Sequence, residues 1–243
     1  MKQVVFLGSK EIGLKCLDIL NQKSKDLNYE IAGVLTNSRG KKIIDFCKNN
    51  NIRLISSLNE YLNLPKVDLA ISVQYHEILK KIHIDKADEI TVNLHMAPLP
   101  EYRGCNQFSY AIIEGVKEFG TTIHVLEEGI DSGSIISEKR FGISDDIWVD
   151  ELYNLTFEKS IELFKETLPK LITGDFNPIP QSDYLSFRKT AIHFRKEIND
   201  IKQIDLDWPK EKIEKHIRAT YMPGFKPPYF IINNRKVELN LLD

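Results

Sequence analysis

The sequence lacks several features that mark specialised classes of protein. It contains no run of about 18 apolar residues, the length that a membrane-spanning helix needs. Residues 1–8 lack the long apolar core of a secretory signal peptide. Lys and Arg number 33 against 35 Asp and Glu, so there is no basic excess typical of a dedicated nucleic-acid-binding protein. These absences predict a cytoplasmic protein whose partners include neither a membrane nor a nucleic acid.

Cysteine is scarce, with only Cys16, Cys47 and Cys105 in the chain. Three cysteines cannot build a disulfide framework, and their spacing matches no zinc motif. A reducing compartment and a protein without a metal site are the simplest interpretation. Cys105 is expected to be a small packing residue, because nothing in the sequence around it marks an activated thiolate.

The glycine motifs of common nucleotide-binding folds are missing after the first predicted strand, residues 3–7. The loop 8–13 has no G-x-G-x-x-G pattern, and Leu14 stands where a P-loop would carry its lysine. The sequence therefore lacks the main motif that would indicate a nucleotide-dependent oxidoreductase. Ser9 and Lys10 remain candidates for contact with a phosphate or nucleotide, although an ordinary turn with a solvated lysine explains them equally well.

Short apolar runs alternate with amphipathic segments through much of the chain. This alternation predicts an α/β fold with a Rossmann-like, doubly wound, mostly parallel sheet. Helices are expected after the first strand and over residues 41–50 and 107–114. The predicted strands cover residues 3–7, 30–36, 53–55, 67–73, 90–95, 120–126 and 134–141.

A long helix is predicted over residues 150–172, where apolar residues recur at helical spacing. Gly174 and Pro178–Pro180 should end this helix. We therefore expect a main domain over residues 1–180 and a small C-terminal appendage over residues 181–243.

The appendage is expected to hold a helix over residues 210–220 and a β-hairpin over 229–239 that turns at Asn233–Asn234. An exposed apolar hairpin is prone to edge-to-edge pairing unless something covers it. We therefore expect the hairpin to pair with a second copy of the chain in a homodimer.

The most informative stretch begins at the predicted strand 90–95. Asn93 and His95 project from the same face of this strand, because strand side chains alternate between faces. Pro98–Pro100 stops the strand, so both side chains lie at its carboxyl end, where ligands bind in open α/β sheets. Further along the chain, Asp131 offers a carboxylate in a turn between two glycines.

A carboxamide, an imidazole and a carboxylate suit acyl or formyl transfer to an amine. His95 can accept the proton that the amine loses, and the Asn93 amide can stabilise the oxyanion. Asp131 can orient the imidazole, as the carboxylate does in hydrolytic triads. For each residue alone a structural role is the better explanation, and only the combination favours chemistry. A metal site from His95, His124 and Asp131 has no familiar ligand spacing, so we expect His124 to be a core residue.

Motifs spread over nearly the whole chain carry a resemblance to a known superfamily: Asn93–His95, Pro98–Pro100, Tyr102–Gly104, Gly120–His124, Asp131–Gly133, Ile204–Trp208, Ile217–Ala219 and Met222–Gly224. They resemble the folate-dependent formyltransferases, which include methionyl-tRNA formyltransferase, glycinamide ribonucleotide transformylase and the N-formyltransferases of nucleotide-linked amino sugars. The run 93–112 is most similar to the sugar enzymes, particularly those acting on dTDP-4-amino-4,6-dideoxyglucose in surface polysaccharide (O-antigen) biosynthesis. The resemblance implies that residues 1–180 form a catalytic domain with Asn93, His95 and Asp131 as catalytic residues.

The resemblance also implies 10-formyltetrahydrofolate as cosubstrate and a dTDP-amino sugar as acceptor. Arg103 is an implied acceptor residue that can equally brace its own loop, and Tyr221 or Tyr229 can stack on a nucleotide base. The residues implied for the cosubstrate are Glu77, Ile78, Leu79, Glu127, Glu128, Gly129 and Ile130. The residues predicted to contact the acceptor are Ser9, Lys10, Gln74, Tyr75, His76, Arg103 and Tyr221.

Two other functions remain open at the level of sequence, formylation of methionyl-tRNA and non-catalytic binding of a nucleotide sugar. The balanced charge argues against the tRNA substrate, because binding to a polyanion favours a basic surface. Methionyl-tRNA formyltransferases add a C-terminal β-barrel, for which residues 181–243 are expected to be too few. The nucleotide and the position of the sugar amine, at C3 or C4, are left open.

Overall fold

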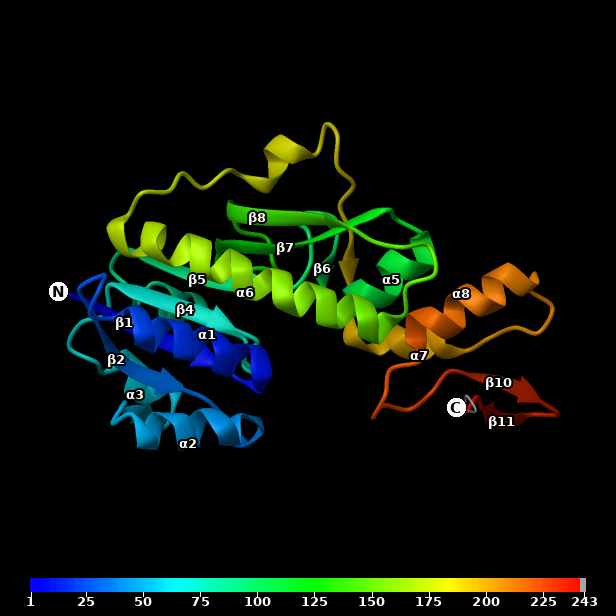
Figure 1. Ribbon diagram of the computed structural model, residues 1–243, viewed down its shortest axis with the longest axis horizontal. Helices are drawn as coiled ribbons and strands as arrows, with labels where there is room; N and C mark the ends of the chain where they lie inside the picture. Colours follow the sequence, from blue (N-terminus) through cyan, green and yellow to red (C-terminus); the bar gives the residue numbers. More distant parts are fainter. Residues whose placement is uncertain (241–243) are drawn as a thin grey trace.

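The computed structural model of the chain describes residues 1–240, and its centre is a twisted β-sheet covered by helices on both faces (Figure 1). In this part of the chain the sheet has seven strands, and the predicted α/β, Rossmann-like, mostly parallel architecture is confirmed. From one edge to the other the strands are β3 (Leu54–Ile55), β2 (Tyr29–Leu35), β1 (Lys2–Gly8), β4 (Leu69–Val73), β5 (Ile90–His95), β7 (Glu118–Val125) and β8 (Ile135–Gly142).

The helices form three groups around this sheet. One face packs against α1 (Lys10–Lys23), α2 (Lys41–Asn49) and the long α6 (Val149–Thr173). The other face is covered by the short α3 (Leu58–Leu62) and α4 (Lys81–Ile84). Beyond the sheet, α5 (Gln107–Glu114) and α8 (Lys210–Thr220) pack with the start of α6, and α7 (Ile198–Lys202) precedes α8.

The first strand shows why both faces need helices. Val4 and Phe6 are fully buried against α1 and α6, whereas Val5 and Leu7 are fully buried in the cluster that includes α3. Strand side chains alternate between faces, so a continuous apolar run is stable only if both faces are covered. This burial fixes β1 in the middle of the sheet.

The strand order places a topological switch between β1 and β4. Both strands end at the same edge, where the backbone N–H of Ser9 donates to the carbonyl of Val73 at 3.3 Å. Ligands of open α/β sheets bind at such a switch, outside the carboxyl ends of the strands. On the far side of β5 the direction changes, because β7 runs antiparallel to β5 and pairs Asn93 with His124.

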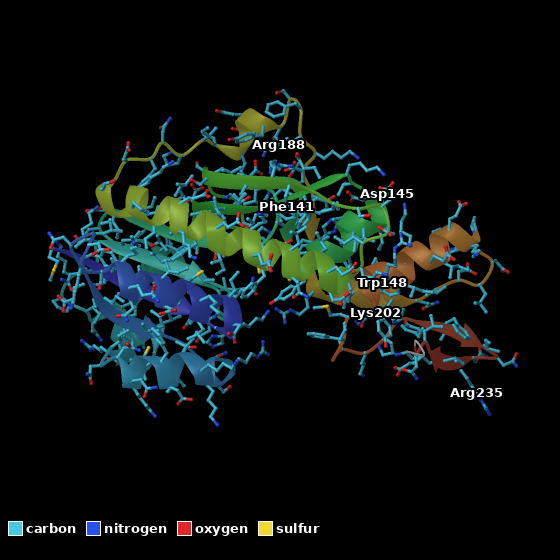
Figure 2. The ribbon with its side chains drawn as sticks, viewed as in Figure 1. Phe141, Asp145, Trp148, Arg188, Lys202 and Arg235 are labelled. Atoms are coloured by element: carbon cyan, nitrogen blue, oxygen red, sulfur yellow. The ribbon has the colours of Figure 1, made fainter. Side chains whose placement is uncertain are left out.

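After α6 the chain runs back along β8, at the edge of the sheet, towards β6. Gly174 ends α6 in the left-handed conformation, and Ile179 then pairs with Ile135 of β8. Further on, β9 (Ile192–His193) forms a parallel bridge with β6 (Arg103–Gly104), beside the end of β5. Arg188 lies on the segment that runs over β8 (Figure 2). It donates to the carbonyl of Leu99 at 2.9 Å. We call residues 179–194 the return segment.

The C-terminal hairpin consists of β10 (Tyr229–Ile232) and β11 (Arg235–Glu238). It turns at Asn233–Asn234, which both have positive φ, as predicted from the sequence. The division of the chain at residue 180 stays a prediction. Among residues 1–240, no helix combines the length and the apolar character needed to cross a membrane.

Candidate active site

Strand β5 brings two polar side chains to its carboxyl end. Asn93 and His95 lie on one face of the strand, and both are paired across to β7. The hydroxyl of Thr121 donates to the backbone carbonyl of His95 at 3.1 Å, and that of Thr122 donates to the carbonyl of Ala97 at 2.9 Å. These bonds fix the backbone where the strand ends, so the position of His95 is set by the sheet.

The orientation of the His95 ring is set by a backbone carbonyl. Its Nε2 lies 2.7 Å from the carbonyl oxygen of Tyr102, and the side chain is only 6% exposed. A carbonyl only accepts hydrogen bonds, so Nε2 carries the proton and donates it. The lone pair of the neutral ring is therefore on Nδ1, which faces Oδ2 of Asp131 across 3.6 Å. The Tyr102 carbonyl is a contact that the sequence did not predict, and the role of Asp131 beside the imidazole stays a prediction.

Asp131 lies between the imidazoles of His95 and His124. Its Oδ2 accepts a hydrogen bond of 2.9 Å from the backbone N–H of Gly104, and its Oδ1 lies 3.5 Å from Nε2 of His124. Burial raises the pKa of the Asp131 carboxyl. Once the two rings are protonated, the charge of His95, the hydrogen bond and charge of His124 and the Gly104 N–H together outweigh burial. The pKa therefore stays below its ordinary value, and the group is a carboxylate at neutral pH.

His124 is the residue that the sequence did not identify. It was expected to have a core role, and it is indeed 2% exposed, but its ring belongs to the polar site. Its Nδ1 donates to the carbonyl of Val125 at 2.7 Å, so Nε2 of the neutral ring accepts from Nδ2 of Asn93 at 3.2 Å. One N–H of the Asn93 amide is used in this bond, and the second is left for another acceptor.

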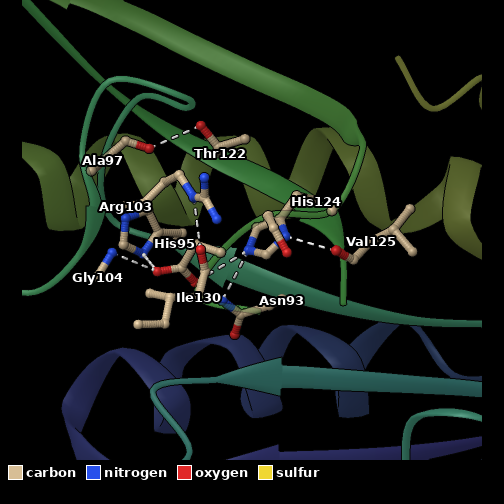
Figure 3. A network of polar contacts seen from close by, with 12 residues as sticks. Asn93, His95, Ala97, Arg103, Gly104, Thr122, His124, Val125 and Ile130 are labelled. Atoms are coloured by element: carbon tan, nitrogen blue, oxygen red, sulfur yellow. Dashed lines mark hydrogen bonds and ion pairs between the residues drawn. The ribbon is translucent and has the colours of Figure 1, made fainter. Parts of the chain in front are cut away.

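The turn that carries Asp131 is held from two sides. Nε of Arg103 donates to the carbonyl of Ile130 at 2.8 Å (Figure 3), which is the bracing role left open for this residue. From the other side, Nε2 of Gln181 donates to the carbonyls of Asp131 and Gly133, at 2.8 and 2.9 Å. The structure thus brings Asn93, His95 and Asp131 together through residues far apart in the sequence.

A second group of predicted residues meets at the switch between β1 and β4. The Ser9 hydroxyl donates to the carbonyl of Gln74, and Nζ of Lys10 lies 3.1 Å from Oε1 of Gln74. Burial and the charges of Arg195 and Arg39 lower the pKa of Lys10. Among the described residues, Lys10, Arg39 and Arg195 have no carboxylate partner, so this edge presents unneutralised positive charge.

The loop after β4 is held mainly by its own side chains. The hydroxyl of Tyr75 donates to Glu77 at 3.3 Å, and His76 lies 3.1 Å from the same carboxylate. Ile78 is 91% exposed, whereas Leu79 is buried in the core against Tyr75. Leu79 therefore anchors the loop to the hydrophobic core, and Ile78 presents an apolar side chain at the loop surface.

A cavity of about 320 Å³ lies between α4, the start of β5 and the end of β7. Thr91 lines it, two residues before Asn93 on β5, and so do Glu127 and Glu128 of the Asp131 turn. Gly129 and Ile130 do not line it, and neither do Asn93, His95 or Asp131. The cavity adjoins the Asp131 turn from the side of α4.

Tyr221 lies apart from the residues that contact Asp131. Its ring packs edge to face on Trp148, at the start of α6 (Figure 2), with 6.4 Å between the ring centroids. No contact among the described residues joins Tyr221 to Asn93, His95 or Asp131. Within residues 1–240, no group of three or more His, Cys, Asp and Glu side chains has the geometry to hold a metal ion.

The site as a whole combines a hydrogen-bond donor, a proton acceptor and a fixed negative charge at one strand end. Comparison with known protein families adds an independent observation, since the family model described as "Formyl transferase" matches residues 1–168. The chain belongs to the formyl transferase family. This membership makes it a formyltransferase, and the predicted resemblance to the superfamily is confirmed.

Relatives of this formyltransferase carry two kinds of name. In sequence, it is 27% identical over 232 residues to a methionyl-tRNA formyltransferase from Clostridium novyi, which covers 88% of this chain and 71% of the relative. In structure, it is similar to a sugar N-formyltransferase from Shewanella sp., with a TM-score of 0.81, 17% identity and coverage of 99% and 97% of the two chains.

Two further solved structures share this fold. An N-formyltransferase from Helicobacter canadensis in complex with folinic acid and dTDP-3-aminofucose gives a TM-score of 0.78 at 22% identity, covering 98% of this chain and 86% of that one. A methionyl-tRNA formyltransferase from Clostridium thermocellum gives 0.64 at 17% identity, covering 98% and 91%.

The lowered pKa of Asp131 predicts a pH-dependent contribution to stability. A carboxyl with a depressed folded-state pKa stabilises the fold fully above its unfolded pKa of about 3.9, and this contribution is lost as the pH falls through the folded-state pKa. Asp131→Asn should therefore lower the free energy of unfolding at pH 6. The difference in free energy of unfolding between this variant and the wild type should decrease as the pH falls below about 4.

Urea unfolding at a series of pH values measures this difference. Asp175→Asn, which replaces an exposed carboxylate just after α6, is the matched control and should show little difference at any pH. If Asp131→Asn lowers the free energy of unfolding by the same amount at every pH, the account is contradicted.

Proposed function

We propose that the protein transfers the formyl group of 10-formyltetrahydrofolate to the amine of a dTDP-linked dideoxy amino sugar. The best candidate is dTDP-4-amino-4,6-dideoxyglucose, used in the biosynthesis of surface polysaccharide (O-antigen) sugars. The observation that carries the formyl-transfer chemistry is the arrangement of Asn93, His95 and Asp131 at the carboxyl end of β5.

In the proposed reaction His95 is the general base. As the sugar amine attacks the formyl carbon, its proton moves to Nδ1 of His95, the nitrogen that the Tyr102 carbonyl leaves unprotonated. The new imidazolium then lies beside the Asp131 carboxylate, which stabilises its charge. Proton transfer to His95 is thus favoured by a charge that is already in place.

Asn93 stabilises the tetrahedral intermediate. The carbonyl oxygen of the formyl group gains negative charge when the C–N bond forms, and the second N–H of the Asn93 amide is available to donate to it. Collapse of the intermediate breaks the bond between the formyl carbon and N10 of the folate. Asp131 assists the return of the proton from His95 to this leaving nitrogen, so tetrahydrofolate departs neutral at N10.

The choice of donor rests on the site and on the structural relatives. The cavity beside the Asp131 turn, lined by Glu127 and Glu128, can admit a flat heterocycle with hydrogen-bonding edges. The Helicobacter canadensis enzyme with the same fold binds folinic acid, a formylated folate. We therefore assign the folate to this side of the site, with Glu77, Ile78, Leu79, Gly129 and Ile130 as the remaining proposed contacts.

The choice of acceptor rests on charged residues at a different part of the sheet edge. Lys10, Arg39 and Arg195 place positive charge at the switch between β1 and β4, where a diphosphate would be favoured electrostatically. The fold also matches the Shewanella sugar enzyme over nearly the full length of both chains, more closely than it matches the Clostridium thermocellum tRNA enzyme. Ser9, Gln74, Tyr75, His76, Arg103 and Tyr221 stay proposed acceptor contacts.

Formylation of methionyl-tRNA is the second candidate, because the sequence relatives carry that name. Identity of 27–28% leaves the substrate open, and the formal net charge of −2 does not favour a polyanionic acceptor. The position of the amine is equally a matter for experiment, because the Helicobacter canadensis enzyme binds a 3-amino sugar.

An acceptor panel tests the proposal directly. The protein is incubated with 10-formyltetrahydrofolate and, separately, with dTDP-4-amino-4,6-dideoxyglucose, a dTDP-3-amino sugar, free 4-amino-4,6-dideoxyglucose and methionyl-tRNA, and formylation is followed by mass. We expect the 4-amino nucleotide sugar to be formylated most efficiently. The free sugar should react poorly, because it lacks the diphosphate that the basic residues would bind. Formylation of methionyl-tRNA alone would establish the second candidate instead.

Replacing the proposed base and oxyanion donor should separate chemistry from binding. We expect His95→Ala to lower kcat by about 10²–10⁴-fold and Asn93→Ala by about 10²–10³-fold, because each removes a group that acts in the transition state. Fluorescence titration with folinic acid should give a folate affinity close to that of the wild type. Near-normal turnover by either folded variant would refute its assigned role.

We also propose that the hairpin pairs with a second copy of the chain. Ile231 and Ile232 are each 44% exposed on β10, so the hairpin presents apolar surface that a partner can cover. Sedimentation velocity should give a dimer for the wild type and a monomer for Ile231→Lys/Ile232→Lys. Leu206→Lys, at an exposed apolar residue outside the hairpin, should stay dimeric. A monomeric wild type would exclude this interface.

A further inference from the structure

The Asp131 turn adopts a backbone conformation that needs support. Asp131 has φ of +44°, in the left-handed region that residues other than glycine rarely occupy. The turn also lies close to β7, since a Cβ on Gly133 would come within 1.9 Å of the carbonyl oxygen of Val125. Such a turn keeps one conformation only when neighbouring groups fix it, and the position of the carboxylate depends on that conformation.

Gln181 makes the contacts that fix the backbone at Asp131. Its side-chain amide donates to the carbonyls of Asp131 and Gly133, so the two N–H groups of one planar group span both sides of Ser132. Because both acceptors are carbonyls, only the nitrogen end of the amide can face the turn. The residue is 8% exposed, and its Oε1 is buried without a hydrogen-bond partner among the described residues.

The return segment brings Gln181 to this place. Ile179 and Ile135 exchange two backbone hydrogen bonds of 2.8 Å as an antiparallel bridge. In an antiparallel register, the residue two positions after Ile179 lies opposite the residue two positions before Ile135. Gln181 therefore faces Gly133, and the end of the long helix α6 is coupled to the turn through this bridge.

The other supports of the turn act elsewhere on it. Arg103 holds the carbonyl of Ile130, and the Ser132 hydroxyl donates to the carbonyl of Glu128 at 3.2 Å. Both of these side chains are more exposed than Gln181. Among the described residues, Gln181 is the one whose side chain holds the carbonyl of Asp131 itself.

We propose that Gln181 is a positioning residue for formyl transfer, which acts by holding the Asp131 carboxylate between His95 and His124. Gln181 does not touch the substrates, and its effect on the reaction passes through Asp131. The kinetic part of this inference rests on the proposed function, whereas the effect on the carboxylate does not.

Two substitutions remove the amide contacts. Gln181→Met keeps the length of the side chain but has no donor, and Gln181→Ala leaves room for water at the two carbonyls and is the variant less prone to misfold. Gln203→Met is the matched control, because Gln203 is exposed in the appendage and away from the turn. Circular dichroism melts establish that each variant is folded.

The first measurement requires no acceptor. Long-range ¹H–¹⁵N spectra of histidine-labelled protein report the ring nitrogens of His95 and His124, which sense the nearby carboxylate. We expect both sets of signals to shift in the folded Gln181 variants and to stay unchanged in Gln203→Met. Ring signals identical to the wild type would overturn the proposal, whatever acceptor the enzyme uses.

The second measurement is a double-mutant cycle on turnover with the acceptor found by the panel. Gln181→Met should lower kcat by about 10–10²-fold with KM for both substrates within about twofold, because a misplaced catalytic group slows the chemical step more than binding. In an Asp131→Asn background the same substitution should change kcat by less than about threefold, since the group it positions is gone.

Together, the two measurements distinguish a failure of this proposal from a failure of the proposed function. Absence of any formylation by the wild type refutes the proposed acceptors, and the ring signals then decide the role of Gln181. An equal loss of kcat from Gln181→Met in both backgrounds would show a general structural effect and refute positioning through Asp131. Wild-type kcat in Gln181→Ala would refute it as well.

Discussion

The active site depends on the placement of one carboxylate between two imidazoles. Asp131 lies 3.6 Å from Nδ1 of His95 and 3.5 Å from Nε2 of His124, and it is fixed by the Gly104 N–H. Because the Tyr102 carbonyl takes the proton-bearing nitrogen of His95, the basic nitrogen is the one beside the carboxylate. A proton that reaches this nitrogen meets a compensating negative charge, which is the electrostatic condition for a general base in a mostly buried site.

Three separate parts of the fold hold this arrangement. Strand β5 ends at the same edge as its parallel neighbours and supplies Asn93 and His95, while the antiparallel β7 brings His124 beside them. The loop after β5 supplies the backbone groups of Tyr102 and Gly104, and β9 pairs with that loop through the return segment. The C-terminal part of the chain is therefore coupled to the site. Within residues 1–240, its side-chain hydrogen bonds to the Asp131 turn come from Gln181.

Much of this could be predicted because it follows from local periodicity. The alternation of strand side chains placed Asn93 and His95 on one face, and the proline-rich stop placed them at the carboxyl end. The sequence predicts only a core role for His124, because its place in the site depends on the antiparallel register between β5 and β7, which no short-range pattern specifies. The contact between Nε2 of His95 and the Tyr102 carbonyl could not be predicted, because a backbone carbonyl has no sequence signature.

The protonation state of His95 is the most direct test of this account. Long-range ¹H–¹⁵N spectra of histidine-labelled wild-type enzyme at about pH 8, assigned with the help of His95→Ala, distinguish the two neutral tautomers. The geometry requires the proton on Nε2, donated to the Tyr102 carbonyl, and an unprotonated Nδ1 beside Asp131. A His95 ring with its proton on Nδ1 would contradict the account, because the base would then have no lone pair beside the carboxylate.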